Sequence, residues 1–514
     1  MSELLADAGQ LEHGIVARDH VRDRGAHGGA QAPLDPEPLC VQPKRVRVAR
    51  RERLLDRVAW RPARAGGRLE ERSDLGLEQG NGIGHGDAPV GIIRARDRRG
   101  MGRVAHSRCP DGPLPRTLSL ALAALVALAL AAPAAAADPT LKARLDRALR
   151  VPNVDPTLTA ALAIDLRTGA VVYSRNASLS LVPASNQKVP VAYAALAALG
   201  GGFRFHTEVV GTGSQIDEVW AGNLVLRGFG DPTLQTFDLE HLAAQVAALG
   251  IRRVTGAVVG DESWFDARRT APGWKPRFYI EQSPPLSALV VARGMYRGKT
   301  APQPALAAAA LFRQALEAQG ILVARPSRAR TLTQAGLPLA RDVSEPLAKI
   351  VRFMGRESDN FTAELIVKQL GAVELGRGTT AAGLRVVRRS LAEAAVPLVG
   401  VRLADGSGLS RLDRLTADAI VALLEAGLAN PTIRDAFVAS LAVAGVDGTL
   451  TGRMRSRPAR GRVIAKTGST SIASALSGFV RNRYVFAILQ NGAPISSYWA
   501  RLAQDRFATI LASG

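Results

Sequence analysis

Two side chains in the first half of the chain could carry out nucleophilic chemistry together. Ser185 lies three residues before Lys188, and an apolar helical pattern, Val-Pro-Val-Ala-Tyr-Ala-Ala-Leu, follows directly. This spacing predicts that Ser185 lies at or near a helix N-terminus and that both side chains share one helix face. A serine hydroxyl is a weak nucleophile until a base takes its proton, and a lysine is such a base only where its pKa is lowered. The alternative is a helix cap followed by a surface lysine, and this motif alone does not decide between the two.

The choice of lysine at position 188 is informative in this chain. Of the 66 basic residues, 58 are arginine and 8 are lysine. Arginine is permanently charged and could not accept the serine proton. None of the other seven lysines has a serine three residues before it. A lysine at this place is therefore informative, although the motif by itself leaves both interpretations open.

A second motif, Ser358-Asp-Asn360, begins another helical stretch, Phe-Thr-Ala-Glu-Leu-Ile-Val-Lys. The alternative is an ordinary N-cap, since Ser174-Arg-Asn176 has the same pattern without an evident role. A third motif, Lys466-Thr467-Gly468-Ser469, follows a short strand pattern. Lysine and threonine at a strand end can bind a carboxylate, and glycine leaves room for a ligand backbone; an ordinary turn is the alternative.

The sequence lacks the motifs that other kinds of hydrolase need. After residue 137 the only histidines are His206 and His241, and there is no Gly-x-Ser-x-Gly elbow for a Ser-His-Asp enzyme. There is no His-Glu-x-x-His zinc motif, and both cysteines, Cys40 and Cys109, lie earlier in the chain. We therefore expect neither a metal site nor a disulfide in this part of the protein.

The elements that must position these motifs lie at both ends of the region from 138 to 514. Strand patterns at 158–165 and 170–174 flank a turn, those at 471–480 and 484–490 flank another, and a helix closes the chain at 496–511. Two terminal hairpins predict one α/β (α+β) domain, residues 138–201 and 339–514, whose antiparallel sheet needs both ends of the chain. The segment 202–338, rich in short strand-like pieces broken by turns, is predicted to be one or two inserted β-rich domains.

The N-terminal part shows a different composition. Residues 1–100 have no sustained apolar period and are predicted to be a disordered, non-native extension. Residues 101–137 combine arginines, an apolar run at 118–132 and an alanine-rich end, as in a secretory signal peptide. A transmembrane helix is the less favoured alternative, because the run is short. We therefore expect an exported protein, periplasmic, or extracellular if there is no outer membrane.

Taken in order, Ser-x-x-Lys, Ser-x-Asn and Lys-Thr-Gly form the signature of penicillin-binding proteins and serine β-lactamases. Residues 138–514 resemble the low-molecular-mass penicillin-binding proteins that act as D-alanyl-D-alanine carboxypeptidases and endopeptidases, in the subgroup with a large insertion between the first two motifs. Further stretches that resemble this family are at 183–188, 228–234, 405–411 and 447–450.

The resemblance implies a penicillin-binding/β-lactamase-like transpeptidase fold, a cofactor-free serine mechanism and a role for each motif. Ser185 would attack the bond between two D-alanines with Lys188 as base, and Ser358 and Asn360 would move a proton to the leaving amine and hold the substrate. Lys466 and Thr467 would bind the substrate carboxylate, Gly468 would leave room beside the strand, and Ser469 would share the oxyanion hole with Ser185. The partners implied are peptidoglycan peptides ending in D-Ala-D-Ala, with β-lactams as inhibitors.

One stretch departs from the family. The family usually has asparagines after the Ser-Ala-Leu that precedes the Ser-x-Asn helix, where this chain has Leu286-Ser-Ala-Leu-Val-Val-Ala-Arg293. A serine β-lactamase is the nearest alternative enzyme, although those are generally compact, and a catalytically idle peptidoglycan-binding scaffold is the alternative outside enzymes. The net charge of +21 favours contact with anionic wall or membrane surfaces, which general solubility explains equally well, and no basic and aromatic pattern indicates nucleic-acid binding.

Overall fold

The computed structural model describes residues 139–331 and 336–514. The predicted N-terminal extension and the predicted signal peptide lie outside the described residues. Within the described ranges, no helix combines the length and the apolar character needed to cross a bilayer.

A six-stranded sheet joins the two ends of the described chain. Its order is β10-β11-β12-β13-β1-β2, and every neighbouring pair is antiparallel. The strands are β1 (Thr159–Asp165), β2 (Ala170–Arg175), β10 (Ala442–Val443), β11 (Val463–Ser469), β12 (Ala473–Val480) and β13 (Tyr484–Asn491). Because β1 pairs with β13, the sheet needs both ends of this region, and both predicted hairpins are confirmed within two residues.

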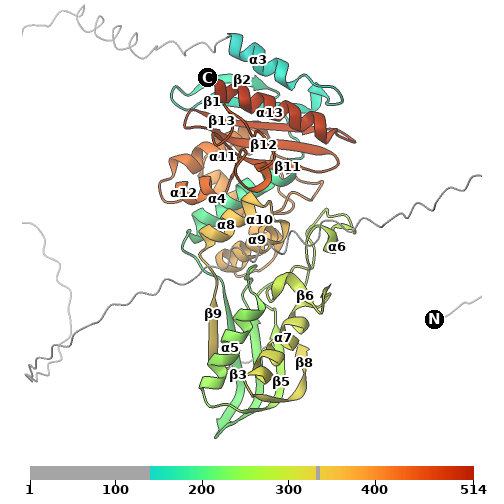
Figure 1. Cartoon of the computed structure of the whole chain (residues 1–514), viewed down its shortest axis with the longest axis vertical. Helices are drawn as coiled ribbons and strands as arrows, with labels where there is room; N and C mark the ends of the chain where they lie inside the picture. The colour runs from blue at the N-terminus through green and yellow to red at the C-terminus, as the bar shows by residue number, and fades with distance from the viewer. Residues whose placement is uncertain (1–138, 332–335) are drawn as a thin grey trace, which may run out of the picture. The chain divides into compact units, whose positions relative to one another are not determined.

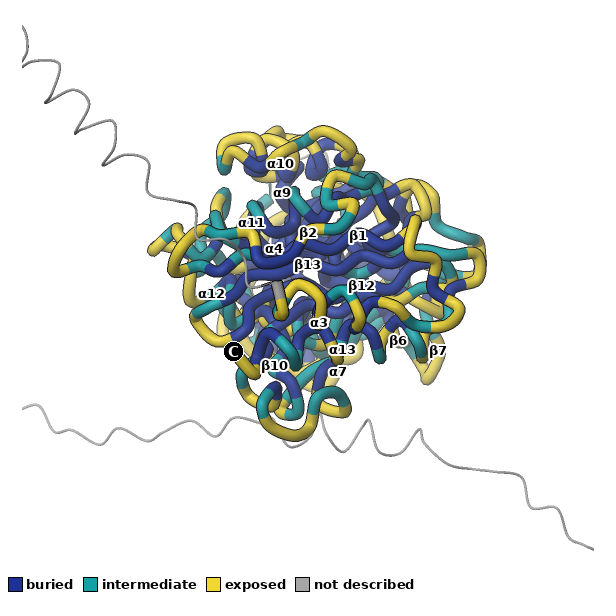
Figure 2. The backbone as a smooth tube through the Cα atoms, turned by 90° about the horizontal axis from the view of Figure 1, so that it is seen from above, coloured by how far each residue is buried: buried dark blue, intermediate teal, exposed yellow. Residues whose placement is uncertain are grey.

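Helices cover both faces of this sheet, which explains why its strands are apolar on both sides (Figures 1 and 2). Along β13, Val485, Ala487 and Leu489 pack against one helical layer, while Phe486 and Ile488 pack against the other. The first layer contains α4 (Lys188–Leu199), α8 (Leu347–Arg356), α9 (Asn360–Leu375), α10 (Thr380–Glu393), α11 (Ala417–Ala429) and α12 (Arg434–Ala439), and the second contains α3 (Pro139–Leu149) and α13 (Ser497–Ser513). The predicted fold class, an antiparallel sheet flanked by helices, is confirmed.

A second, five-stranded sheet forms between α4 and α8 in the chain (Figure 1). Its order is β8-β5-β4-β3-β9, and it is mixed, since β5 runs parallel to both of its neighbours. The strands are β3 (His206–Ile216), β4 (Val219–Gly228), β5 (Arg253–Asp261), β8 (Leu322–Ala329) and β9 (Leu337–Val343). Helices α5 (Thr236–Ala248) and α7 (Pro304–Ala318) share an apolar core with one face of this sheet.

The segment from 262 to 303 lies between β5 and α7 in the chain. It holds a single-turn helix, α6 (Phe278–Glu281), a 3₁₀ turn, η4 (Ala292–Gly294), and a small hairpin, β6 (Met295–Tyr296) and β7 (Lys299–Thr300). Our sequence analysis described residues 202–338 as β-rich and did not anticipate α5 and α7, and the predicted boundary at 338 falls inside β9. The division into domains stays a prediction.

Candidate active site

Ser185 lies in a 3₁₀ turn, η3 (Ala184–Gln187), that runs directly into α4. The predicted helix therefore exists, with the serine one tight turn ahead of its α-helical part. From 181 to 196 every residue is buried except Ser185, which is partly exposed. The turn thus presents one hydroxyl to the outside while the rest of the segment anchors it in the core.

The amine of Lys188 lies at the centre of a hydrogen-bond network. Its Nζ is 3.2 Å from Ser185 Oγ, 2.8 Å from Asn360 Oδ1 and 2.6 Å from the backbone oxygen of Ser407. The side chain is almost completely buried. The surface-lysine alternative is therefore wrong for this residue.

Burial lowers the pKa of Lys188 to about 8, because an ammonium loses its hydration in the protein interior. Nearby carboxylates oppose this shift, first Asp405 and then Asp359, Glu364 and Asp413. A pKa near 8 leaves a useful fraction of neutral amine at physiological pH. That neutral amine, 3.2 Å from Ser185 Oγ, can accept the serine proton.

The second motif meets the first through two different residues. Ser358 has a left-handed backbone, with φ 57°, and directly precedes Asp359, the N-cap of α9. Asn360 is the first residue of that helix, and its amide oxygen accepts from Lys188. Ser358 Oγ accepts a hydrogen bond of 2.8 Å from Lys466 Nζ. The motif therefore links the two buried lysines.

Lys466, Thr467, Gly468 and Ser469 form the end of strand β11. Lys466 is buried, and burial followed by the neighbouring Lys188 charge holds its pKa well below the usual lysine range. Thr467 Oγ1 lies 2.8 Å from the hydroxyl of Thr449, while Ser469 is exposed at the strand end. The lysine and threonine side chains are thus held beside the serine turn.

Gly468 lets β11 approach the nucleophile turn closely. A Cβ at this position would lie 2.9 Å from the backbone oxygen of Pro183 and 3.1 Å from the backbone nitrogen of Ser185. Any larger residue would push the strand away from Ser185. All eight predicted site residues therefore lie in one neighbourhood, and their catalytic roles stay predictions.

A loop at residues 404–413, which contains the family-like stretch 405–411, contacts Lys188 through the backbone oxygen of Ser407. Asp405 is buried and accepts hydrogen bonds from the backbone N–H groups of Gly408 and Ser410, at 2.7 and 2.8 Å, and from Trp274 Nε1 at 2.8 Å. These bonds fold the loop so that the Ser407 carbonyl faces the lysine.

Glu364 is a residue that our sequence analysis missed. It lies one helical turn after Asn360, is completely buried, and accepts from the backbone N–H groups of Gly406 at 3.0 Å and Ser407 at 2.8 Å. Burial, with a further contribution from Asp405, raises the pKa of Glu364 to about 8. A charged residue in a stretch of α9 that is otherwise mostly apolar was the available signal.

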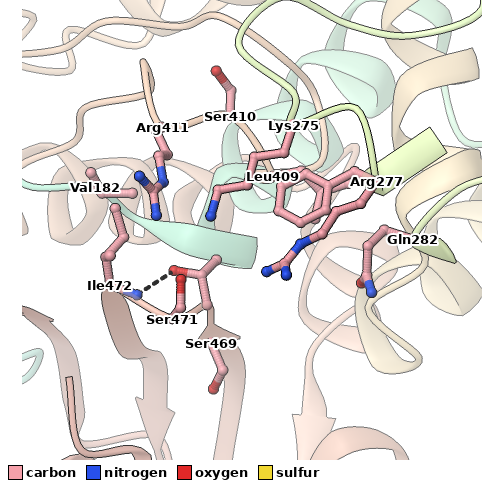
Figure 3. A pocket seen from close by; sticks show the side chains of 12 residues that line it. Val182, Lys275, Arg277, Gln282, Leu409, Ser410, Arg411, Ser469, Ser471 and Ile472 are labelled. Atoms are coloured by element: carbon pink, nitrogen blue, oxygen red, sulfur yellow. Dashed lines mark hydrogen bonds between the residues drawn. The ribbon is translucent and has the colours of Figure 1, made fainter. Parts of the chain in front are cut away.

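A pocket of about 190 Å³ opens beside Ser469 (Figure 3). Lys275, Arg277 and Arg411 extend into it, and no acidic side chain is among the lining residues. Burial and the adjacent Arg411 and Arg277 lower the pKa of Lys275, as expected where cations gather. The other lining residues are Val182, Phe278, Gln282, Leu409, Ser410, Thr470, Ser471 and Ile472. The pocket therefore favours an anionic group.

No group of three or more His, Cys, Asp or Glu side chains in the described part of the chain is arranged to hold a metal ion.

Comparison with known proteins identifies relatives along most of the chain. The D-Ala-D-Ala carboxypeptidase 3 (S13) family matches residues 141–305 and 298–513. A D-alanyl-D-alanine carboxypeptidase of Actinomadura sp. (strain R39) is 32% identical over 510 residues, covering 80% of this chain and 91% of the relative. The carboxypeptidase DacB of Mycolicibacterium smegmatis is 33% identical over 393 residues, covering 70% of this chain and 82% of the relative.

Solved structures with the same fold include penicillin-binding protein 4 from Haemophilus influenzae. It aligns with a TM-score of 0.64 and 23% identity over 72% of this chain and 98% of that protein. A second structure of it, in complex with a β-lactam, aligns with a TM-score of 0.58 and 25% identity over the same shares of both chains. The chain therefore belongs to the D-Ala-D-Ala carboxypeptidase 3 (S13) family and is a serine-type D-Ala-D-Ala carboxypeptidase of the penicillin-binding type.

Proposed function

We propose that Ser185 is the nucleophile with which this enzyme cleaves peptidoglycan peptides ending in D-Ala-D-Ala, and that Lys188 is its general base. The observation that carries the proposal is the buried Lys188 amine, with a pKa of about 8, at 3.2 Å from Ser185 Oγ. A neutral amine at this distance activates a hydroxyl that is otherwise a weak nucleophile.

In the acylation step, Ser185 Oγ attacks the carbonyl carbon between the two D-alanines while its proton moves to Lys188. Backbone N–H groups of Ser185 and Ser469 stabilise the oxyanion of the tetrahedral intermediate. Ser358 donates its proton to the leaving nitrogen and then receives the proton that Lys188 took from Ser185. The terminal D-alanine therefore departs with a neutral amine. Asn360, which accepts a hydrogen bond from Lys188, binds the substrate amide.

The carboxylate of the terminal D-alanine would lie against Lys466 and Thr467, at the end of β11. Burial lowers the pKa of Lys466, and an arriving carboxylate raises it again, so that the amine takes up a proton from solvent and binds the carboxylate as an ammonium group. Water then attacks the acyl-enzyme, Lys188 accepts a proton from it, and the shortened peptide leaves with Ser185 restored.

The cationic pocket beside Ser469 fits the part of the peptide that lies before the D-Ala-D-Ala end. Lys275, Arg277 and Arg411 supply three positive charges, so a stem peptide that carries free carboxylates is favoured over a neutral one. The signal-like segment at 101–137 supports an exported enzyme, in the periplasm or outside the cell. The excess of Lys and Arg over Asp and Glu in residues 138–514, 45 against 29, supports contact with anionic wall material. Endopeptidase action on cross-linked peptides would use the same residues.

Intact-mass analysis after incubation with benzylpenicillin tests this proposal, with Ser185→Ala as the control. We expect a stable penicilloyl adduct on the wild-type protein and none on the variant. Rapid hydrolysis of penicillin without a lasting adduct would instead indicate a β-lactamase. Neither adduct nor hydrolysis would indicate an idle wall-binding protein and contradict the proposal.

A further inference from the structure

The stretch that departs from the family pattern ends at Arg293, and the structure places this arginine against the second catalytic motif. Arg293 lies in the turn η4, with a left-handed backbone at φ 56° and ψ 35°. A left-handed conformation is uncommon for a residue other than glycine and needs support from its surroundings. Here the side chain supplies contacts that hold the turn against the N-terminus of α9.

The guanidinium of Arg293 donates hydrogen bonds from two nitrogens to the carboxylate of Asp359. Nη2 lies 2.7 Å from Oδ2 and Nη1 lies 3.3 Å from Oδ1. The guanidinium also lies over the ring of Phe361, with its carbon 5.2 Å from the ring centroid, and Phe361 is buried. Arg293 therefore contacts the residues on both sides of Asn360.

Asp359 connects this contact to the reacting groups. It is the N-cap of α9, accepting a hydrogen bond of 2.8 Å from the Thr362 backbone N–H, and it separates Ser358 from Asn360. The segment before Arg293 makes a second contact, from Asn360 Nδ2 to the backbone oxygen of Gln282 at 3.0 Å. Asp359 and Asn360 are thus both held by the 262–303 segment as well as by their own helix.

The ion pair also acts on the charge around Lys188. The titratable groups that act electrostatically on the Lys188 amine are Asp359 at the start of α9, Glu364 further along α9, Asp405 and Asp413 in the 404–413 loop, and Lys466 on β11. Asp359 raises the pKa of Lys188 by stabilising the ammonium form. A cation paired with Asp359 offsets that effect and keeps more of the lysine neutral.

We infer that Arg293 is a positioning residue for the acylation reaction, one that fixes Ser358 and Asn360 through Asp359 and balances the Asp359 charge beside the general base. The inference rests on the proposed roles of Ser185 and Lys188. It assigns to the 262–303 segment a direct part in the geometry of the active site.

Two variants separate the two parts of this role. Arg293→Gln removes the charge, and Arg293→Lys keeps the charge but loses the planar fork that binds a carboxylate with two nitrogens. The measurement is the second-order rate constant of acylation by benzylpenicillin, followed by intact mass across a pH range centred on about 8. We expect Arg293→Gln to acylate roughly ten- to a hundredfold more slowly at neutral pH and to move the acid limb of the profile to higher pH. Arg293→Lys should be slower with its acid limb unmoved.

A double variant and a matched control complete the experiment. Adding Asp359→Asn to Arg293→Gln removes the unbalanced charge while keeping a good N-cap, so the acid limb should return to its wild-type position. Arg313→Gln is the control: Arg313, in α7, pairs with Glu317 at 2.7 Å and is 32% exposed, against 37% for Arg293. This control should have the wild-type acylation rate and the wild-type pH profile.

The outcomes that overturn the inference are distinct from failure of the proposed function. If Arg293→Gln had the acylation rate and the pH profile of the wild type, Arg293 would have no positioning role. A loss that is equal at every pH and is matched by Arg313→Gln would reduce its role to general stability. If the wild-type protein formed no adduct, the proposed function would fall, and this inference with it.

Discussion

The regions around the two sheets differ in their buried lysines. Among the described residues these occur only around the six-stranded sheet, whereas the five-stranded region buries the carboxylates Asp231 and Asp261. The core between the five-stranded sheet and helices α5 and α7 is apolar, with Trp220 and Phe312 among its fully buried side chains. The region of the six-stranded sheet buries Lys188, Lys466 and Glu364 as well as its apolar side chains. Burying such groups costs folding free energy unless they are fully compensated. The buried lysines therefore agree with the proposed chemistry in the six-stranded region, and the apolar core of the other region agrees with a scaffold role.

One buried charge from each region illustrates the difference. In the five-stranded sheet, the buried carboxylate of Asp261 is paired with Arg227 at 2.8 Å. In the six-stranded region, the hydrogen bonds of Lys188 Nζ lead to a hydroxyl, an amide oxygen and a carbonyl oxygen. A lysine with neutral partners can lose its proton, whereas one locked to a carboxylate resists losing it.

The largest effect is expected from Lys188→Arg, which keeps a positive charge but provides no base. An arginine side chain does not lose its proton in a protein, so Ser185 would be left without an acceptor. We expect acylation by benzylpenicillin to slow by roughly a thousandfold or more. Intact mass over time measures the rate, and circular dichroism checks that the variant is folded. A folded variant that acylates within tenfold of the wild type would refute Lys188 as the base.

A smaller effect is expected from pH alone. In the proposed mechanism, the neutral amine of Lys188 is the active form. Because its pKa is lowered to about 8, the neutral fraction falls as pH drops below that value. The acylation rate should fall about tenfold for each pH unit well below the pKa and level off above it. Stopped-flow or mass measurements across this range give the profile. A flat profile from neutral pH upwards would mean that a different group limits the reaction.

The sequence predicted the parts of the catalytic region whose signals are local. Both hairpins at the chain ends and the closing helix α13 follow from strand alternation, turn residues and helical periodicity, which need no knowledge of tertiary contacts. The three motifs could be recognised because Ser185 and Lys188, for instance, are neighbours along the chain. Their grouping in space was expected through resemblance to a family rather than from residue spacing.

Other features depend on contacts between distant segments, so the sequence could mark the residues as unusual but could not name their partners. The partners of Glu364 lie in the loop 404–413, some forty residues later. Its carboxylate accepts hydrogen bonds from backbone N–H groups of that loop. The ion pair of Arg293 with Asp359 joins a turn and a helix cap that lie 66 residues apart. Helix α5 was a different kind of omission, because Leu239, Leu242, Ala243 and Val246 have helical spacing, but nearby glycine-rich turns led to a β-rich interpretation.

The smallest effect on catalysis is expected from a large change in the five-stranded region. Phe312 is fully buried in the core of α7 and that sheet, and Phe312→Ala would leave a cavity there. The free energy of unfolding should fall by roughly 3–5 kcal/mol. The rate of penicillin acylation per folded molecule should remain that of the wild type, because this core lies outside the hydrogen-bond network of Lys188.

Phe237→Ala provides the matched comparison, since Phe237 belongs to α5 in the same region but is 55% exposed. It should change thermal stability little, as surface substitutions do. Thermal unfolding and acylation rate, measured for both variants at a temperature where both are folded, separate the two regions. If Phe312→Ala lowered the acylation rate of the folded protein as strongly as Arg293→Gln, the five-stranded core would have to shape the active site as well. The division between a scaffold region and a reactive region would then be wrong, and the 262–303 segment would transmit packing in one core to geometry in the other.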